Sequence, residues 1–528
     1  MPQFIASRIR SPSGGTGPSA ALGEIVADLS MSFAARRDIG LARQFLADKF
    51  GETRFWLYGA GTHSAALLAH FADAWATHLA GIVDRDPAGR THFCGFAIHG
   101  IPDVVRDSGA PILVAHPFFE SAMADGLRAA GVEDWRIHHL YLNPDFIELS
   151  RTSLAPIINQ VPAVILGSTR YITVSDGDLA QILDPAVIPY LAFDLFEQTE
   201  PRPPFTLIPM DKSVDAVVAA LESLRPRLVY LRTKMETDFL AYLVRQVLPD
   251  CILVHELWDF SVVFEDRTLV QWLKFPAAFI EASRLAECWS VRESDLILSK
   301  WGGKEWAQLF DDGIGTELFF GGIGAAPPPL AVPRTGGVPR VLYAGLLPKP
   351  EDLSAMPYDY NFLGRLERLA QSDAAEVTIL NSGHECADLD ETYRDYVTRF
   401  AAAGIRYGRR VAYVDLMSIA AEHDFGWLAL DEREEWDLGK RWLVPMRFTG
   451  YVQAGLPIVI SEPWGLCVDL VERFSAGIVL EDDSDLAARR ALREANPDSL
   501  RRGVRELHAQ LRQSNLRILT KISNLLRA

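Results

Sequence analysis

The feature that most limits the fold of this chain is the regular alternation of short apolar strands with helical segments. Apolar runs that end in glycine or small polar residues recur from about residue 54 to residue 461, and segments of helical periodicity separate them. Strands that alternate with helices form parallel sheets whose faces are covered by the helices. Because the pattern occurs in three successive series, we expect an α/β protein with three such units.

The first series predicts a Rossmann-like domain over residues 51–150. Its strands are RFWLYGAG (54–61), LAGIVDRD (79–86) and APILVAHP (110–117), and residues 1–50 before it predict a disordered start and a helical lead-in.

The first strand-to-helix turn of this domain predicts a nucleotide site. Gly59, Gly61 and Ser64 form a GxGxxS turn, and Asp84 ends the next strand, 25 residues after Gly59. In dinucleotide folds such glycines let the backbone approach a pyrophosphate, and the acid binds a ribose. The occupant is left open: NAD, a nucleotide sugar, or none, in which case the domain is architectural.

The second and third series predict two further lobes, over residues 153–325 and 338–528. The second includes QVPAVILGS (160–168) and CILVHELWD (251–259), and the third opens with RVLYAGLLP (340–348). Between them, residues 325–339 hold five prolines without apolar periodicity, which is typical of a linker.

Composition excludes several classes of partner and location. With 52 Lys and Arg against 69 Asp and Glu, the net charge is −17, so nucleic acid is not expected as a partner. The five cysteines lie far apart, which suggests reduced thiols, and no metal-ligand spacing is visible. No secretion signal and no apolar run of about 18 residues occur, so we expect a cytoplasmic protein.

The last segment, residues 500–526, predicts an amphipathic helix. Its apolar face consists of Leu500, Val504, Leu507, Leu511, Ile518, Ile522 and Leu525. From Arg489 onward the chain carries ten Lys and Arg and three acids. Two interpretations stand: a helix packed across the body of the protein, or a basic helix that makes peripheral contact with the inner face of a membrane.

The segment Pro445–Ile460, PMRFTGYVQAGLPIVI, combines an Arg, a short helical run, a Gly-Leu-Pro turn and a buried strand. It resembles the donor-binding segment in the C-terminal lobe of GT-B glycosyltransferases, especially the GT4-like group. Three other blocks resemble this lobe in the same order: RVLYAGLLPKPED, IRYGRRVAYVDLMSIAAEHDFGWLAL and ERFSAGIVLEDDSDLAA. LVHELWDF resembles a strand end of the family's N-terminal lobe.

The resemblance implies a nucleotide-sugar donor bound to the third unit. Arg447 stands where the family has a phosphate-binding Lys, and Gly345 and Lys349 lie in the loop after the opening strand. Both cations would offset charge on the departing diphosphate. GT-B enzymes achieve this with cations and helix dipoles, so no metal and no other cofactor is expected.

The sequence departs from the family at the paired glutamates that serve the donor. Trp442 and Gly450 stand at those positions, and Leu346 replaces an Arg found in many GT4 enzymes. Either carboxylates of the acidic run 431–435 replace them, with Asp431 and Glu434 as candidates, or the donor site has degenerated.

Polar residues in the second unit are candidates for acceptor chemistry. His255, Glu256 and Asp259 sit at the carboxyl end of a strand, where α/β sheets bind ligands. His255 would orient a sugar hydroxyl, and Asp259 would act as base or charge partner. Ser168 and Thr169 follow the first strand of the unit, near the expected position of the reacting sugar.

The sequence and the resemblance together imply a glycosyltransferase of bacterial surface polysaccharide or glycoprotein synthesis. Its acceptor would be a glycan, a lipid-linked sugar or a protein. Two alternatives remain: an epimerase of the same fold that acts on a nucleotide sugar, and a degenerate relative that serves as a binding or scaffold protein.

Overall fold

The computed structural model describes most of the chain between Phe45 and Arg527. The segments outside the description are 1–44, 47–48, 52, 61–63, 65–66, 69–77, 86, 88–90, 107–108, 116–119, 141, 146–160, 168–175, 193–204, 210–213, 234, 262–268, 270–276, 303–315, 325–336, 351–361, 385–386, 431–440, 481–483 and 528.

The first sheet is built from the N-terminal series of strands. Its strands are β1 (Phe55–Tyr58), β2 (Leu79–Asp84), β3 (His92–Phe93), β4 (Phe96–Gly100), β5 (Ile112–Val114) and β6 (Ile137–His139). Their order is β3-β4-β2-β1-β5-β6, and only the β3–β4 hairpin is antiparallel. The helices α5 (Ile101–Arg106) and α6 (Glu120–Ala129) belong to this unit.

The second sheet has seven strands, all parallel. They are β7 (Ala163–Gly167), β8 (Pro189–Ala192), β9 (Thr206–Pro209), β10 (Leu228–Thr233), β11 (Ile252–Leu257), β12 (Leu296–Ser299) and β13 (Thr316–Leu318). Their order is β13-β12-β11-β10-β7-β8-β9. The helices between them are α8 (Asp176–Leu179), α9 (Val214–Leu224), α10 (Leu240–Val247) and α12 (Ala277–Glu293).

The third sheet is a parallel sheet of six strands. They are β14 (Arg340–Gly345), β15 (Glu376–Asn381), β16 (Arg406–Gly408), β17 (Phe425–Trp427), β18 (Ile458–Ser461) and β19 (Gly477–Leu480). Its helices are α14 (Phe362–Gln371), α15 (Arg394–Ala402), α16 (Tyr413–Ala421), α18 (Met446–Gln453), α19 (Gly465–Phe474), α20 (Asp485–Glu494) and α21 (Pro497–Arg527).

The strand order of the third sheet is that of a Rossmann fold. The order β16-β15-β14-β17-β18-β19 corresponds to 3-2-1-4-5-6 within the unit. The direction of winding therefore reverses between β14 and β17, and the same reversal occurs between β7 and β10 in the second sheet. These observations confirm the predicted fold class, an α/β protein with two Rossmann-like lobes and an additional N-terminal sheet.

The N-terminal sheet has a core of its own. Two clusters of buried apolar side chains cover its two faces, and every buried member lies between Phe45 and Leu140. A separate cluster covers one face of the second sheet, with α10 packed against β10 and β11 and α9 packed against α10.

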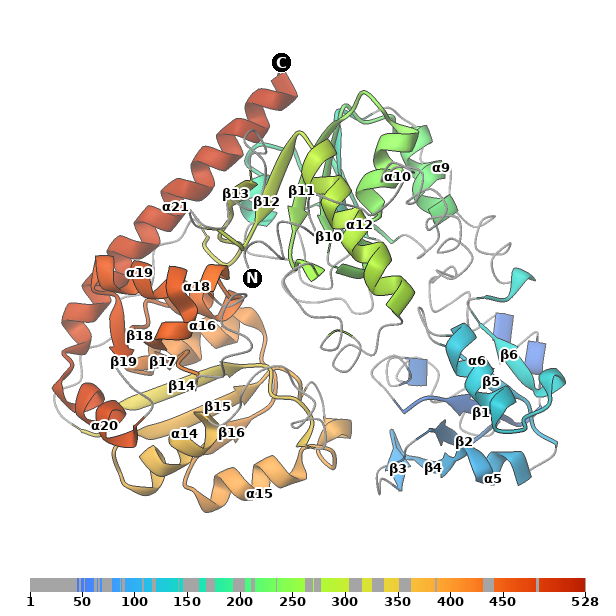
Figure 1. The fold of residues 1–528 in the computed structure, drawn as a ribbon, viewed down its shortest axis with the longest axis horizontal. Coiled ribbons are helices and arrows are strands. Elements are labelled where there is room, and N and C mark those ends of the chain that lie inside the picture. The colour runs from blue at the N-terminus through green and yellow to red at the C-terminus, as the bar shows by residue number, and fades with distance from the viewer. Residues whose placement is uncertain are drawn as a thin grey trace.

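The second and third sheets are joined by backbone contacts and by one long helix. Trp301 and Leu443 form an antiparallel bridge, with Val444 N donating to Lys300 O at 2.9 Å. Helix α21 runs along one side of both lobes (Figure 1). Its first half packs on the third lobe through Val504, Leu507 and Leu511, and its second half packs on the second lobe through Ile518, Leu519 and Ile522. The predicted C-terminal helix thus packs on both lobes and connects them.

Two expectations from the sequence concern disulfide bonds and membrane-spanning helices. The cysteines in the described part of the chain form no disulfide; they are Cys94, Cys251, Cys288 and Cys467. Among the helices that the structure describes, none has the length and apolar character needed to cross a bilayer.

Candidate functional site

The carboxyl end of β14, at the reversal point of the third sheet, brings together two residues named from the sequence. A Cβ atom at Gly345 would lie 3.0 Å from Nε of Arg447 and 3.1 Å from its Cζ. A side chain at this position would crowd the guanidinium, so glycine leaves room for Arg447 to lie close to the strand. The Cζ atom of Arg447 also lies 4.4 Å from the centroid of the Tyr343 ring, which is a cation–π contact.

Arg447 is the second residue of α18, so its charge adds to that of the helix N-terminus. Pro445 precedes the helix with φ −69° and ψ 147°, an extended conformation in which proline starts a helix without losing a needed N–H donor. A helix N-terminus carries a partial positive charge. The combination with Arg447 at the end of a parallel strand is suited to an anion such as a diphosphate.

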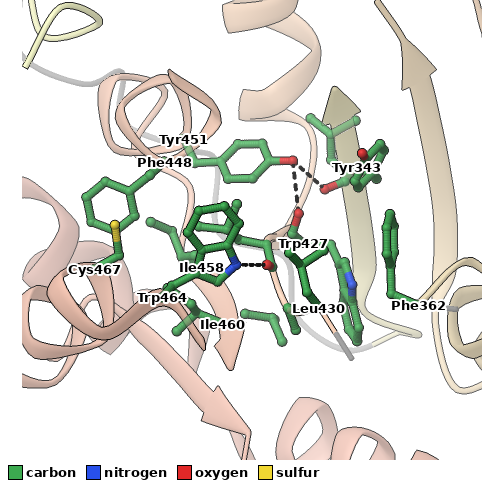
Figure 2. Close-up of a cluster of buried hydrophobic side chains, with 14 of the residues drawn as sticks. Tyr343, Phe362, Trp427, Leu430, Phe448, Tyr451, Ile458, Ile460, Trp464 and Cys467 are labelled. Carbon is green, nitrogen blue, oxygen red and sulfur yellow. Dashed lines mark hydrogen bonds between the residues drawn. The ribbon is translucent and has the colours of Figure 1, made fainter. Parts of the chain in front are cut away.

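Tyr451 fixes α18 against the sheet one turn after Arg447. Its hydroxyl accepts a hydrogen bond from Ala344 N at 3.0 Å. It donates to Leu342 O at 3.1 Å, with Trp427 O at 3.4 Å, and Figure 2 shows these two contacts as dashed lines. Both β14 and β17 are therefore tied to the helix, and Figure 2 shows the aromatic cluster that surrounds this contact. The position of Arg447 follows from this anchoring.

Side chains of β14 and β15 hold the loop that follows β14. Asn381 Oδ1 accepts hydrogen bonds from Leu347 N at 2.9 Å and Gly383 N at 2.8 Å. The hydroxyl of Tyr343 donates to Leu346 O at 3.1 Å. Lys349, the second predicted phosphate-binding cation, lies half-buried later in this loop.

A small pocket with an internal volume of about 10 Å³, open to solvent on one side, lies where the second lobe meets α18. Its lining residues are Glu256, Leu257, Trp258, Ser299, Lys300, Phe319, Gly321 and Met446. Met446 is the first residue of α18, so this pocket adjoins the segment that carries Arg447.

Glu256 is the carboxylate of this pocket, and three donors hold it. Its Oε2 accepts from Tyr230 Oη at 2.7 Å and from Arg232 Nε at 2.8 Å. Its Oε1 accepts from Trp258 Nε1 at 3.1 Å. Because a carboxylate oxygen has two lone pairs, Oε1 can accept a second hydrogen bond.

A fully buried arginine lies behind Glu256. Arg232 on β10 is the register partner of Glu256 on β11, and its Nη2 lies 2.9 Å from Asp176 Oδ1. Burial acts against the charge of Arg232, but Asp176 and Glu256 together outweigh it and raise the pKa of the guanidinium. This buried group brings one guanidinium and two carboxylates together behind the pocket.

Asp259 and Lys300 form an ion pair at the pocket wall. Lys300 Nζ lies 2.8 Å from Asp259 Oδ1 and 5.8 Å from the centroid of the Trp258 ring. The predicted Asp259 is therefore one partner of a neutral pair, while Lys300 lines the pocket.

His255 points into the interior of the second lobe. The side chain is fully buried, and its Nε2 lies 2.6 Å from Thr233 Oγ1, which in turn donates to Asp238. Burial lowers the pKa of His255 to about 3, so the imidazole is neutral. Direct contact with a substrate would require the surrounding side chains to move.

Several predicted residues lie outside the described part of the chain. These are Asp431, Glu434, Ser168, Thr169 and Gly61. Their roles stay predictions.

The side chain of Asp84 holds the turn after β1 in the N-terminal unit. Asp84 Oδ2 accepts a hydrogen bond from Ala60 N at 2.9 Å, and Gly59 adopts φ 103°. Ser64 is buried, with its Oγ 3.9 Å from where a Cβ at Gly59 would lie. A ribose hydroxyl that donated to Asp84 would share the carboxylate with the N–H group of Ala60. The nucleotide role stays a prediction.

Sequence reasoning missed Tyr343, Arg232, Trp258 and Lys300. Arg232 gave one signal, a charge within the apolar strand LVYLRT, because a charged side chain inside a sheet requires a partner. Among the described residues, no group of three or more His, Cys, Asp or Glu is arranged to hold a metal ion.

Comparison with known proteins gives likenesses of fold at low identity. No family model matches the chain, and no curated protein matches its sequence. Anabaena Alr3699/HepE in complex with UDP and glucose matches with a TM-score of 0.45 and 11% identity, over 69% of this chain and 100% of that chain. An E. coli structure described as trehalose-6-phosphate bound with UDP-2-fluoro glucose gives 0.43 and 13%, over 69% and 99%. The lipopolysaccharide outer core galactosyltransferase WaaB gives 0.42 and 11%, over 67% and 98%.

Proposed function

We propose that this chain is a glycosyltransferase that binds a nucleotide sugar on its third lobe and an acceptor on its second. The observation that carries the proposal is the placement of Arg447, which lies against Gly345 at the reversal point of a Rossmann-type sheet and at the start of α18. Ligands of such sheets bind at this point, and the fixed cation and helix dipole suit a diphosphate.

The pocket beside α18 supplies the second half of the reaction. An acceptor hydroxyl attacks the anomeric carbon of the donor sugar, and the bond from that carbon to the diphosphate oxygen breaks. The bonding electron pair leaves with the diphosphate, whose charge Arg447 and the helix N-terminus stabilise. Glu256, the carboxylate that lines the pocket, accepts the hydroxyl proton.

The buried residues behind Glu256 prepare it for this role. Tyr230 and Arg232 hold the carboxylate by donating to Oε2, and Trp258 holds it by donating to Oε1. We assign Asp259 to the pairing of Lys300 and His255 to the support of Thr233, because those are the contacts that their side chains make.

The test has two stages. A thermal-shift screen against UDP, GDP, CDP and ADP sugars identifies the donor as the compound that raises the unfolding temperature. Mass spectrometry after incubation of that donor with a glycoside panel then separates three outcomes. Transfer adds one sugar mass to an acceptor, whereas an epimerase would change only the donor and a scaffold would change neither. We expect transfer, and we expect EDTA to leave its rate unchanged. A donor screen without any stabilising compound would overturn the proposal.

A further inference from the structure

A short segment of the second lobe packs directly on α18, the helix that carries Arg447. This crossing segment, residues 319–324, follows β13, and all six of its residues are buried. Gly322 lies against Thr449, and Gly324 N donates to Gln453 Oε1 at 2.7 Å. Because Thr449 and Gln453 are four residues apart, they lie on the same face of α18, and the crossing segment covers that face.

Gly322 occupies a position where a side chain has no room. Its φ lies outside the left-handed region, so the backbone conformation does not require glycine. A Cβ atom here would lie 2.9 Å from the Cβ of Thr449 and nearer still to its Oγ1, whereas carbon atoms in ordinary contact are about 3.5–4.0 Å apart. The close approach of the crossing segment to α18 therefore explains this glycine.

The Thr449 side chain is poorly able to make room. It is buried, and its Oγ1 donates to Met446 O at 3.0 Å within the first turn of α18. Branching at Cβ also restricts the rotamers of threonine. A side chain at position 322 would therefore displace backbone, either that of the crossing segment or that of α18.

Helix α21 holds the crossing segment in place. Asn515 is fully buried; its Oδ1 accepts from Phe320 N at 3.0 Å, and its Nδ2 donates to Phe320 O at 3.0 Å. His508 Nε2 lies 3.0 Å from the Gln453 oxygen that accepts from Gly324. The segment is thus tied on both sides of Gly322, so we expect the displacement to fall on α18.

A displaced α18 would move Arg447 relative to β14. Arg447 precedes Thr449 by two residues, and its Nε already lies within 3.0 Å of the place of a Cβ atom at Gly345. A shift of about 1 Å in groups that position a substrate can cost about 100-fold in activity. The spacing at Gly322 therefore bears on the proposed diphosphate site.

We propose that Gly322 and Thr449 are positioning residues for this site: their contact sets the distance between α18 and the second lobe, and so holds Arg447 beside Gly345. The inference rests on the proposed function, since it takes the donor diphosphate as the ligand of Arg447. It gives the second lobe a part in donor binding that is separate from the chemistry assigned to Glu256.

Complementary substitutions in the full-length protein test the contact. The ligand is whichever of UDP, GDP, CDP and ADP binds the wild-type protein, titrated by calorimetry at a temperature where every variant is folded. We expect Gly322→Ala to bind it at least about tenfold more weakly than the wild type. Adding Thr449→Gly removes both atoms that the new Cβ would meet, and should return the affinity to within about threefold of that of Thr449→Gly alone.

Two controls separate the position of α18 from general stability. Gly126→Ala adds the same methyl group on α6, where no atom lies within 4 Å of it, and should bind like the wild type. Leu492→Ala removes a buried side chain of α20, so its urea midpoint should fall while its affinity stays. A loss of affinity in Leu492→Ala as large as that in Gly322→Ala would overturn the inference.

Hydrogen exchange of the wild-type protein gives a second measurement, which does not require Gly322→Ala to fold. A nucleotide bound at Arg447 should steady α18 and slow amide exchange at Gly324, whose N–H group is bonded to Gln453. Exchange in α9, which belongs to a different cluster of the second lobe, should not change.

Three results would overturn the inference while leaving the proposed function standing. They are wild-type affinity in Gly322→Ala, a double variant that binds no better than Gly322→Ala, and unchanged exchange at Gly324 when the nucleotide binds. Failure of all four nucleotides to bind the wild-type protein would overturn both the inference and the proposed function.

Discussion

The guanidinium of Arg447 lies over the ring of Tyr343, 4.4 Å from its centroid, and against the backbone of Gly345. Burial raises the pKa of Tyr343, and Arg447 opposes that rise, so the phenol stays neutral beneath the cation. The same phenol donates to Leu346 O, which joins the Arg447 side chain to the loop after β14. Tyr343 is thus a positioning residue for the cation of the proposed donor site.

Replacing Tyr343 tests this positioning role. Tyr343→Leu removes the aromatic face, and we expect donor binding to weaken about fivefold, since an exposed or partly buried cation–π contact contributes about 1 kcal/mol. Tyr343→Phe keeps the ring and should weaken binding less. Calorimetric titration of the donor gives both values, and equal losses in the two variants would show that the ring itself has no role.

Arg232 supplies a prediction about stability. Arg232→Met leaves Asp176 and Glu256 buried without their cation, which should destabilise the protein by roughly 3–5 kcal/mol. Arg368→Met breaks an exposed ion pair with Asp485 and should cost about 0–1 kcal/mol. Urea unfolding followed by tryptophan fluorescence compares the two. A similar shift in both variants would contradict the importance of the buried network.

The buried neutral state of His255 predicts a pH dependence. Its pKa in the folded protein is about 3, against about 6.5 in an unfolded chain. Between these values only the unfolded chain binds the proton, so stability falls as the pH decreases, by about 1.4 kcal/mol per unit.

We therefore expect the wild-type protein to lose more stability than His255→Gln between pH 7 and pH 5. The urea midpoints of the two proteins at each pH measure this. His423 and His508 also have lowered pKa values, caused mainly by burial, but they are present in both proteins and do not affect the difference. Parallel pH profiles would show that His255 titrates normally.

The separate core of the N-terminal sheet predicts that the chain can be shortened. Its buried members all lie between Phe45 and Leu140. A chain that starts at Ser153 should therefore fold, as judged by circular dichroism, and should bind the donor as the full-length protein does. A folded chain that no longer binds the donor would place part of the donor site in the first 152 residues.

The sequence was sufficient to predict the fold class because the evidence is local. Apolar runs, glycine turns and helical periodicity each lie within a few residues of one another, and their order along the chain indicates three parallel sheets. The pairing of Arg447 with the loop at Gly345 was also predicted, through the resemblance of two separate segments to one family's donor lobe.

The pocket that contains Glu256 was predicted only in part, because it depends on the register between strands. Arg232 and Glu256 are 24 residues apart and meet because β10 and β11 pair in that register. His255 and Glu256 are adjacent in sequence but lie on opposite faces of the strand. The alternation of residues along the strand does not show which of the two faces the pocket. In the structure, Glu256 lines the pocket and His255 does not.

The central claim is that Arg447 binds the diphosphate of a nucleotide sugar, and one pair of variants tests it most directly. Arg447→Ala removes a charge-assisted contact of roughly 1.5–3 kcal/mol, whereas Arg505→Ala removes an exposed arginine of α21. Each is titrated by calorimetry with the donor from the thermal-shift screen and with its nucleoside diphosphate. We expect Arg447→Ala to bind both at least about tenfold more weakly than the wild type, with circular dichroism unchanged and Arg505→Ala unaffected. Affinities in Arg447→Ala equal to those of the wild type would contradict the claim.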